Sequence, residues 1–339
     1  MHARSSLGPV SALLDVYQQA MLFHGICAVS RLGIPDLLAD GPRTVPELAT
    51  AVDGDEGALR RVLILLACHG VLDLDREADR AALTELGEVL CRRHPYALGA
   101  TFATFGVPDV AHALTETIRT GAPATTVAVG TGFWEHLARH PEQQTLFGDA
   151  MAEQARLLTL PCVPLLDWPS SGTVADIAGG SGLLLAHILD EQPGLSGVLV
   201  DQPQVLEQAL GALKDAGVDG RCTVHEGDLL GPPPPADMYV LSRVLHNWDD
   251  AGVVRILAAL ARGARAGAVL RVFEDVLPGD RLPTAPQAWA DLAMLMFYEG
   301  ARERTAAEFR ALLAAGGWRL ERVVQGPPGM CVIEAGRAP

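Results

Sequence analysis

A carboxylate and a cluster of glycines follow one another in the segment Val174–Gly182, which reads Val-Ala-Asp-Ile-Ala-Gly-Gly-Ser-Gly. The apolar residues around Asp176 predict a short strand, and the run Leu183–Leu189 predicts a helix after the last glycine. Glycine has no Cβ, so a ligand can approach the backbone of such a turn closely. The helix start adds free N–H groups and the positive end of its dipole. The segment therefore predicts a nucleotide-like cofactor held in a βαβ unit.

The spacing of the glycines distinguishes between cofactors. A dinucleotide fingerprint needs glycine at its first, third and sixth positions, but the sixth position counted from Gly180 is Leu185. The pattern Asp-x-Gly-x-Gly-x-Gly, which is typical of S-adenosylmethionine (SAM) binding, matches at Asp176, Gly180 and Gly182 and departs only at Ala178. The turn therefore favours SAM over a nicotinamide dinucleotide.

Two further carboxylates end the next two predicted strands. Asp201 lies roughly 20 residues past the glycine turn, where a carboxylate can accept both hydroxyls of a ribose. Its alternative role is to cap the helix expected from about Val205, and the ribose role is favoured. Asp228 follows the third strand, in Gly227-Asp-Leu. A contact near an adenine and simple capping are equally compatible with its spacing.

The fourth strand leads into Leu241-Ser-Arg-Val-Leu-His-Asn-Trp248. Ligands of open α/β sheets bind beyond the carboxyl ends of the strands, so His246 is expected to face the site. A neutral imidazole can take a proton from a phenol. Glu274 and Glu303 are candidates to accept the imidazole N–H, which would fix its tautomer and raise its basicity. A lone histidine is more often structural, Glu303 also suits the first turn of a helix, and Trp248 suits either adenine stacking or the core.

The elements that position these groups fall into three predicted regions: 1–95, 96–170 and 171–339. Residues 11–32 predict a long helix with apolar residues on several faces, which needs a cover such as a second copy of the chain. A capping box at Thr44 and Glu47, helices over 46–51 and 57–69, and alternating segments at 71–74 and 82–84 predict a winged helix. Its acidic wing is a poor match to phosphate, so dimerisation is favoured over DNA binding.

From Thr173 onward, short apolar strands alternate with helices, which predicts an α/β fold with a mostly parallel sheet. Strands are expected at 173–177, 197–200, 222–225, 238–241 and 269–273. The last pair, 319–324 and 330–334, is joined by too short a linker for a helical crossover and should be antiparallel. Residues 96–170 are expected to form a helical linker and substrate lid. The candidates to line an apolar substrate pocket are Trp134, Phe147, Met151, Met294, Phe297 and Tyr298, although Met294 and Phe297 also suit plain core.

Composition narrows the possible partners. The net charge of −15 argues against nucleic acid and anionic membranes, which need clustered Lys and Arg. No apolar stretch reaches the length of a membrane span. The six cysteines are scattered without a C-x-x-C pair, as expected for reduced thiols of a cytoplasmic protein.

Taken in order, these motifs resemble those of the SAM-dependent O-methyltransferases, including the plant phenolic and bacterial natural-product enzymes. The resemblance covers nearly the whole chain and rests on six short motifs, namely Asp176–Gly182, Asp201, Gly227–Asp228, Leu245–Trp248, Glu274–Pro278 and Glu303–Thr305. It implies a Rossmann-like SAM domain behind a winged-helix dimerisation domain, a homodimer and no metal. It also implies cofactor contacts near methionine, ribose and adenine, from Asp176, Gly179, Gly180, Gly182, Asp201, Asp228, Leu229, Ser242, Arg243 and Trp248.

The implied reaction is methyl transfer from SAM to a hydroxyl, phenolic by expectation, of an aromatic natural product, with S-adenosylhomocysteine (SAH) as product. His246 would be the general base, flanked by Glu274 and Glu303. Ser242 stands where the family often has Lys or another polar residue, which predicts a weaker cofactor contact. Three alternatives remain: a SAM-binding relative that hydroxylates or cyclises its substrate, a winged-helix regulator, and an NAD enzyme.

Overall fold

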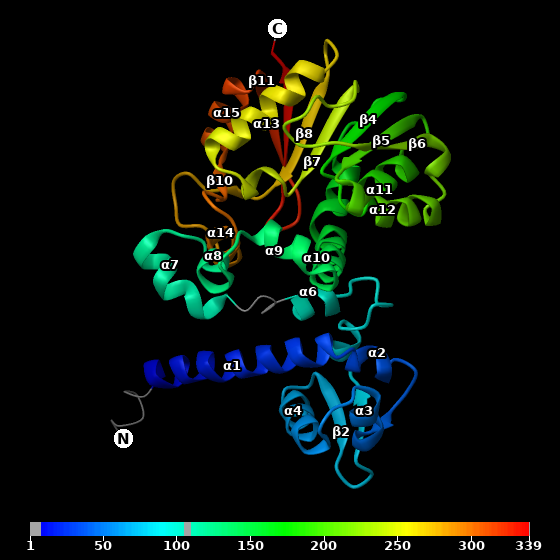
Figure 1. Ribbon diagram of the computed structural model, residues 1–339, viewed down its shortest axis with the longest axis vertical. Coiled ribbons are helices and arrows are strands. Elements are labelled where there is room, and N and C mark those ends of the chain that lie inside the picture. The colour runs from blue at the N-terminus through cyan, green and yellow to red at the C-terminus, as the bar shows by residue number, and fades with distance from the viewer. Residues whose placement is uncertain (1–7, 105–109, 339) are drawn as a thin grey trace. The chain divides into compact units, whose positions relative to one another are not determined.

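The computed structural model describes residues 8–104 and 110–338 of the chain. It divides the chain into two compact units, each with its own core (Figure 1). The first unit is Met1–Asp109 with Pro141–Glu153, and the second is Val110–His140 with Gln154–Pro339. The domain boundaries expected at residues 95 and 170 stay predictions.

The first unit carries the predicted winged helix behind a long helix. The capping box is present, because the Glu47 N–H donates to Oγ1 of Thr44 while the Glu47 carboxylate accepts from the Thr44 N–H. The three short strands form an antiparallel sheet in the order β1-β3-β2. The elements are α1 (Gly8–Arg31), α2 (Ile34–Leu38), β1 (Arg43–Thr44), α3 (Val45–Ala51), α4 (Glu56–Cys68), β2 (Leu72–Asp75), β3 (Arg80–Leu83), α5 (Glu85–Glu88), α6 (Gly99–Thr104) and α10 (Pro141–Gln154).

The helix α1 exposes large apolar side chains over its N-terminal half. They are between 51% and 73% exposed, although leucines and valines are usually buried in a folded chain. An apolar surface of this kind on one helix is typical of an interaction site. Its residues are Val10, Leu13, Leu14, Val16, Tyr17 and Met21.

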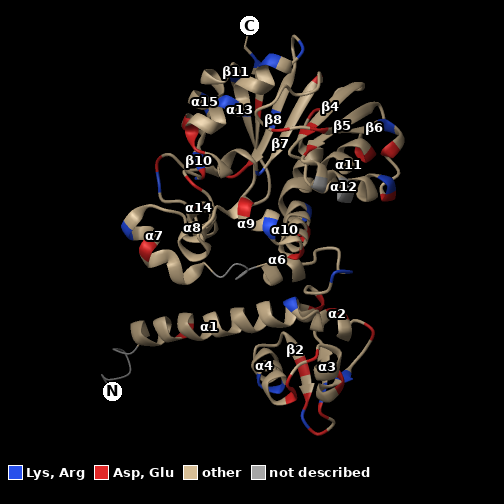
Figure 2. Cartoon of the chain, viewed as in Figure 1, with Lys and Arg blue, Asp and Glu red and all other residues tan. Residues whose placement is uncertain are grey.

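Acidic side chains pair with one of the two arginines on the second helix of the winged helix, α4. Arg60, on the helix that would enter a DNA groove, forms ion pairs with both Glu56 and Asp79. Figure 2 shows acidic and basic residues interspersed over α3, α4 and the wing. This surface does not present the concentrated positive charge that phosphate binding requires.

The second unit is built on a seven-stranded sheet in the order β11-β12-β8-β7-β4-β5-β6. Strand β12 is antiparallel to both of its neighbours, and the four pairs from β8 to β6 are parallel. The predicted sheet and its antiparallel last pair are therefore confirmed. The strands are β4 (Gly172–Ile177), β5 (Leu195–Asp201), β6 (Cys222–Glu226), β7 (Met238–Ser242), β8 (Val269–Glu274), β11 (Trp318–Gln325) and β12 (Cys331–Arg337).

Helices cover both faces of this sheet (Figure 1). Successive strand residues point to opposite faces, so Val174 packs in one apolar cluster and Ala175 in the other. The first cluster includes α11 (Leu183–Glu191) and α12 (Pro203–Asp215), and the second includes α13 (Asp250–Gly263) and α15 (Ala306–Ala315).

The strand order reverses between β4 and β7, which lie side by side at the centre of the sheet. A reversal of this kind opens a crevice at the carboxyl ends of the strands, where α/β proteins bind their ligands. The glycine turn after β4 and the segment Ser242–Trp248 after β7 both begin at this edge.

The remaining elements of the second unit are short. They are η1 (Ala111–Ala113), α7 (Leu114–Thr120), α8 (Ala124–Val129), α9 (Phe133–Arg139), η2 (Ala155–Thr159), η3 (Leu160–Leu165), η4 (Asp219–Arg221), η5 (Leu245–Asn247), β9 (Val276–Leu277), α14 (Ala285–Phe297) and β10 (Arg304–Thr305). Among the described residues, none of the helices has the length and apolarity to cross a bilayer. All six cysteines are free thiols.

Candidate active site

The glycine turn between β4 and α11 needs its glycines for two reasons. Gly180 and Gly182 adopt φ values of 57° and 73°, in the left-handed region that glycine enters without steric cost. A Cβ on Gly179 would lie 2.4 Å from Cδ1 of Leu199. Gly182 is also the N-cap of α11 and has no side chain to cap it, so the first N–H groups of this helix remain available to a ligand.

Asp201 faces the glycine turn and does not cap the following helix. Its Oδ2 accepts the Gly180 N–H at 2.8 Å and its Oδ1 accepts the Gln202 N–H at 2.7 Å. The N-cap of α12 is Gln202. Burial raises the pKa of Asp201. Each carboxylate oxygen has lone pairs to spare, which can accept hydroxyl groups of a ligand.

Asp176 is buried directly beneath this turn. Neither of its carboxylate oxygens has a hydrogen-bond partner of good geometry among the described residues. Burial, followed by the charge of Asp201, raises the pKa of Asp176 to about 7, and the backbone N–H of Leu185 offsets this only in part. A buried carboxyl without partners is costly, so its presence here indicates a role in holding a polar ligand or the turn around it.

The three residues expected near adenine, Asp228, Leu229 and Trp248, lie in the loop after β6 and directly after η5. Asp228 is exposed, and its Oδ1 accepts the Leu230 N–H at 2.8 Å, which closes a local turn. Leu229 and Trp248 are half-buried, and each packs against the apolar cluster that includes α13. The structure therefore shows the capping contact of Asp228 and leaves its adenine contact a prediction.

Glu274 holds the backbone of the segment that presents His246. Its Oε1 accepts the N–H groups of Val244, Leu245 and His246 at 3.1, 2.8 and 3.3 Å. The side chain is fully buried at the end of β8. A carboxylate that accepts three backbone donors fixes this turn rigidly relative to the central sheet.

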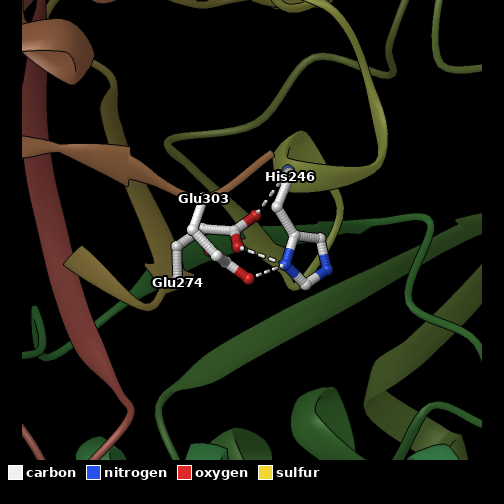
Figure 3. Close-up of side chains that lie close together, drawn as sticks. All are labelled: His246, Glu274 and Glu303. Atoms are coloured by element: carbon white, nitrogen blue, oxygen red, sulfur yellow. Dashed lines mark hydrogen bonds and ion pairs between the residues drawn. The ribbon is translucent and has the colours of Figure 1, made fainter. Parts of the chain in front are cut away.

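Two carboxylates approach the same side of the His246 imidazole (Figure 3). Its Nδ1 is 2.8 Å from Oε1 of Glu303 and 3.3 Å from Oε2 of Glu274. This arrangement places the Nδ1 proton toward the carboxylates and leaves Nε2 as the nitrogen that can accept a proton. Figure 3 shows Nε2 directed away from both carboxylates.

A small second sheet brings the two carboxylates together. Strand β9 follows Glu274 and pairs in parallel with β10, which follows Glu303, so that Arg304 lies opposite Val276. The Glu303 N–H also donates to Oδ1 of Asp291 at 2.9 Å. Two residues 29 positions apart in the sequence are thus held on the same nitrogen of His246.

The electrostatics of the cluster favour a protonated imidazole. Burial lowers the pKa of His246, but the charges of Glu274 and Glu303 outweigh it, and the pKa is raised overall. Burial raises the pKa of Glu274. The three side chains together can therefore take up and share a proton.

Ser242 and Arg243, which begin the segment that presents His246, have different partners. Oγ of Ser242 lies 3.2 Å from Oγ1 of the buried Thr159. Arg243 adopts a φ of 55° and its N–H donates to the carbonyl of Phe273 at 2.9 Å. The contacts of Ser242 and Arg243 with the cofactor stay predictions.

Four aromatic rings of the second unit pack together near the end of α14. Trp134 stacks on Tyr298 with centroids 5.4 Å apart, and Phe133 makes edge contacts with Phe297 and Tyr298. Burial raises the pKa of the Tyr298 hydroxyl. Met294 is buried at 7% exposure. The structure thus brings three of the predicted aromatic residues together.

The other predicted pocket residues, Phe147 and Met151, lie on α10 in the first unit. Their role in substrate binding stays a prediction.

Two residues of the site escaped the sequence analysis. The guanidinium of Arg304, fully buried, donates to the carbonyls of Leu245 and Trp248 on either side of His246 and pairs with Asp250. Phe133 completes the aromatic group. The buried arginine carries no local signal in the sequence, whereas Phe133 could have been included with its neighbour Trp134.

These observations fit a bound SAM. The turn has a glycine where a Cβ would clash, an uncapped helix start and a carboxylate with free lone pairs. The buried, unpartnered Asp176 lies just beneath. Backbone N–H donors and carboxylate acceptors in this arrangement suit a nucleoside cofactor that has a ribose and a charged amino-acid portion.

Comparisons with known proteins agree. The family model of the O-methyltransferase domain matches residues 111–319, and that of the O-methyltransferase dimerisation domain matches residues 14–93. The mitomycin biosynthesis 6-O-methyltransferase of Streptomyces lavendulae is 36% identical over 96% of this chain and 93% of its own length. The phenazine O-methyltransferase PhzM of Lysobacter antibioticus is 35% identical over 98% of both chains.

Solved structures show the same fold. That of LaPhzM has a TM-score of 0.91 at 34% identity and covers 97% of this chain and 99% of its own. The neocarzinostatin O-methyltransferase NcsB1, solved with SAM and 2-hydroxy-5-methyl naphthoic acid, has a TM-score of 0.79 at 32% identity, over 93% and 95%. A more divergent function occurs in the aclacinomycin 10-hydroxylase RdmB of Streptomyces purpurascens, 33% identical over 85% of this chain and 79% of its own length. With both family models matched over most of its length, the chain belongs to the SAM-dependent O-methyltransferases.

Proposed function

We propose that the protein transfers the methyl group of SAM to a phenolic hydroxyl of an aromatic natural product, with His246 as general base. The observation that carries this proposal is the position of His246 Nδ1 between two carboxylates, which leaves Nε2 available to a substrate hydroxyl. When bound, SAM supplies a methyl group on a sulfonium centre that an oxygen nucleophile can attack in line.

The residues of the site can take up the proton that the substrate hydroxyl loses. Nε2 of His246 would take the hydroxyl proton as the oxygen becomes nucleophilic. The resulting imidazolium would be stabilised by Glu303 at 2.8 Å and Glu274 at 3.3 Å from Nδ1, and the proton would leave to solvent after turnover. Because Glu274 also binds three backbone N–H groups, the ring is oriented before the substrate arrives.

The glycine turn would hold the cofactor. The free N–H groups at the start of α11 suit its carboxylate, and Asp201 suits the ribose hydroxyls. Trp248 and Leu229, half-buried at the same edge of the sheet, suit the adenine. The apolar and aromatic group around Tyr298 suits the acceptor ring.

The three catalytic side chains have ligand atoms within 4.8 Å of one another, a spacing that a metal ion could also bridge. We favour a proton over a metal there. Oε1 of Glu274 already accepts three backbone N–H groups. The carboxylates of Glu274 and Glu303 next to Nδ1 of His246 account for the tautomer of the imidazole without an ion.

The exposed apolar face of α1 supports a homodimer. The matched dimerisation domain, residues 14–93, includes most of this helix. The six exposed side chains from Val10 to Met21 are large enough to form the core of an interface between two copies.

Calorimetric titration with SAH, with NADH as control, tests the cofactor without knowledge of the acceptor. Micromolar binding of SAH and silence with NADH are expected. SAH release from SAM in the presence of hydroxynaphthoates then distinguishes methyl transfer from the non-methylating chemistry of a relative such as the hydroxylase RdmB. A folded protein that binds no SAH contradicts the proposal.

A further inference from the structure

Glu274 and Glu303 are held against His246 in different ways. Oε1 of Glu274 accepts three backbone N–H groups, and its strand β8 pairs with β7 and β12 inside the large sheet. Glu303 instead follows a loop and precedes the two-residue strand β10. Its Oε1 contacts Nδ1 of His246, and its buried Oε2 has no hydrogen-bond partner among the described residues. The position of the Glu303 carboxylate therefore depends on the placement of its own backbone.

The side chain of Asp291 holds that backbone from the helix α14. Its Oδ1 accepts the Glu303 N–H at 2.9 Å. Asp291 is half-buried, and a hydrogen bond to a charged acceptor is strong where water is partly excluded. On the other side of the same peptide unit, the Arg302 N–H donates to the carbonyl of His246 at 3.1 Å. These two bonds set where Glu303 lies relative to His246.

A second side chain of α14 contacts the segment that follows Glu274. Nε2 of Gln287 donates to Oδ1 of Asp275 at 2.9 Å and to the carbonyl of Val276 at 3.3 Å. Gln287 and Asp291 are four positions apart, which places both on the same face of the helix. One face of α14 thus contacts the chain beside each of the two catalytic carboxylates.

The same face of α14 continues into the aromatic group. Met294, buried, lies seven positions after Gln287 on this face. Tyr298 follows four positions later, and its N–H donates to the carbonyl of Met294 at 3.0 Å. Its ring stacks on Trp134. The helix therefore connects the side chains that suit an acceptor ring with those that hold the catalytic carboxylates in place.

We propose that Asp291 is a positioning residue that keeps the Glu303 carboxylate against Nδ1 of His246. This inference rests on the proposed function, in which His246 is the base, and adds to it a residue that acts through Glu303. Asp291 works by accepting the Glu303 N–H. An acceptor oxygen is therefore required at this position, and a negative charge is not.

The test measures the pKa of His246 by NMR, in the full-length protein labelled with carbon-13 histidine and saturated with SAH. The chain has ten histidines, and the signal that is missing in H246Q identifies the residue. The charged groups that act on its imidazole are Glu274 on β8, Glu303 before β10 and Arg243 after β7. E303Q removes one of these charges and gives the reference fall in the pKa, roughly one pH unit.

Two substitutions of Asp291 separate the hydrogen bond from the charge. D291A removes the acceptor, so the Glu303 carboxylate can move away from Nδ1, and the pKa of His246 should fall by roughly half to one pH unit. D291N removes the charge but keeps an acceptor oxygen, so the pKa should stay close to that of the wild type. D280A, at an exposed aspartate in the loop before α14, is the matched control and should leave the pKa unchanged.

SAH affinity should be the same in all of these variants, and thermal unfolding should show that each is folded. An unchanged pKa of His246 in folded D291A overturns the proposal. If D291A does not fold, D291L, which keeps the volume of the side chain without an acceptor, takes its place. A fall in D291N as large as that in E303Q also overturns the proposal, because the charge of Asp291 would then account for the effect.

Failure of the proposed function would appear in other measurements. A wild type that binds no SAH, or full turnover in H246Q, would contradict that function without any change at Asp291.

Discussion

Nδ1 of His246 lies 2.8 Å from Oε1 of Glu303, and both side chains are almost fully buried. A hydrogen bond of this length from an imidazole to a carboxylate fixes the orientation of the ring and leaves the opposite nitrogen, Nε2, to accept a proton. Glu274 approaches the same nitrogen from β8, so His246 is oriented by two elements of the fold at once.

The pH dependence of turnover should show the effect of Glu303 on the pKa of His246. A general base works when it is neutral, so activity is expected to rise with pH through the pKa of His246, which lies above its ordinary value. E303Q removes one of the charges that raise this pKa, so the acidic limb should move to lower pH. Steady-state rates across a pH series measure it. The exposed control E299Q should leave the limb in place, and an unmoved limb in E303Q would refute the coupling.

Asp201 should contribute to cofactor affinity. D201N keeps the shape of the side chain but loses the charge that strengthens hydrogen bonds to hydroxyl groups. SAH is expected to bind roughly 10- to 100-fold more weakly, which calorimetry measures directly. D219N, an exposed aspartate on η4, is the matched control and should bind SAH normally. Unchanged affinity in D201N would exclude a ribose contact there.

Buried Asp176 should make the ligand-free protein less stable as pH rises. Its pKa is raised from 3.8 to about 7 in the folded chain, so the folded state binds the proton more tightly than the unfolded state. The free energy of unfolding should therefore fall between about pH 4 and pH 7, by on the order of 4 kcal/mol for this group. Denaturant titrations across this range should show a flatter dependence in D176N. An identical slope in wild type and variant would show that Asp176 does not titrate there.

The strands of the second unit were predictable because each is a short apolar run between helices and turns. All seven expected strands occur, and residues 318–337 form the antiparallel pair that the short linker implied. The role of Asp201 was less determined, because its spacing also suited a helix cap. The structure shows its contact to Gly180, and the cap is Gln202.

The parts that escaped prediction depend on contacts between distant segments. Strands β9 and β10 are two residues each, too short for a periodic pattern, yet they bring Glu303 to the side of Glu274. The buried Arg304 acts through carbonyl groups of the turn that presents His246, which no local motif encodes. The buried Nε of Arg243, which has no acceptor among the described residues, likewise appears only when its surroundings are known.

The apolar face of α1 should hold two copies of the chain together. Tyr17, 70% exposed on α1, is expected to lie in the interface. Y17D would place a charge in that apolar contact, so light scattering after size exclusion should shift from about twice 35.8 kDa toward the mass of one chain. I118D, at an equally exposed isoleucine on α7, should stay dimeric. A wild type that elutes as one chain would contradict the homodimer.

The most direct test of the account is the turnover of H246Q. Gln keeps a polar side chain but cannot take up a proton, so SAH release from SAM should fall by roughly 10²- to 10⁴-fold. The assay is run with excess EDTA, because the proposed site holds a proton and no metal, and the binding of SAH should be unchanged. Full activity in H246Q, with SAH still bound, would contradict His246 as the base and leave positioning alone to carry the reaction.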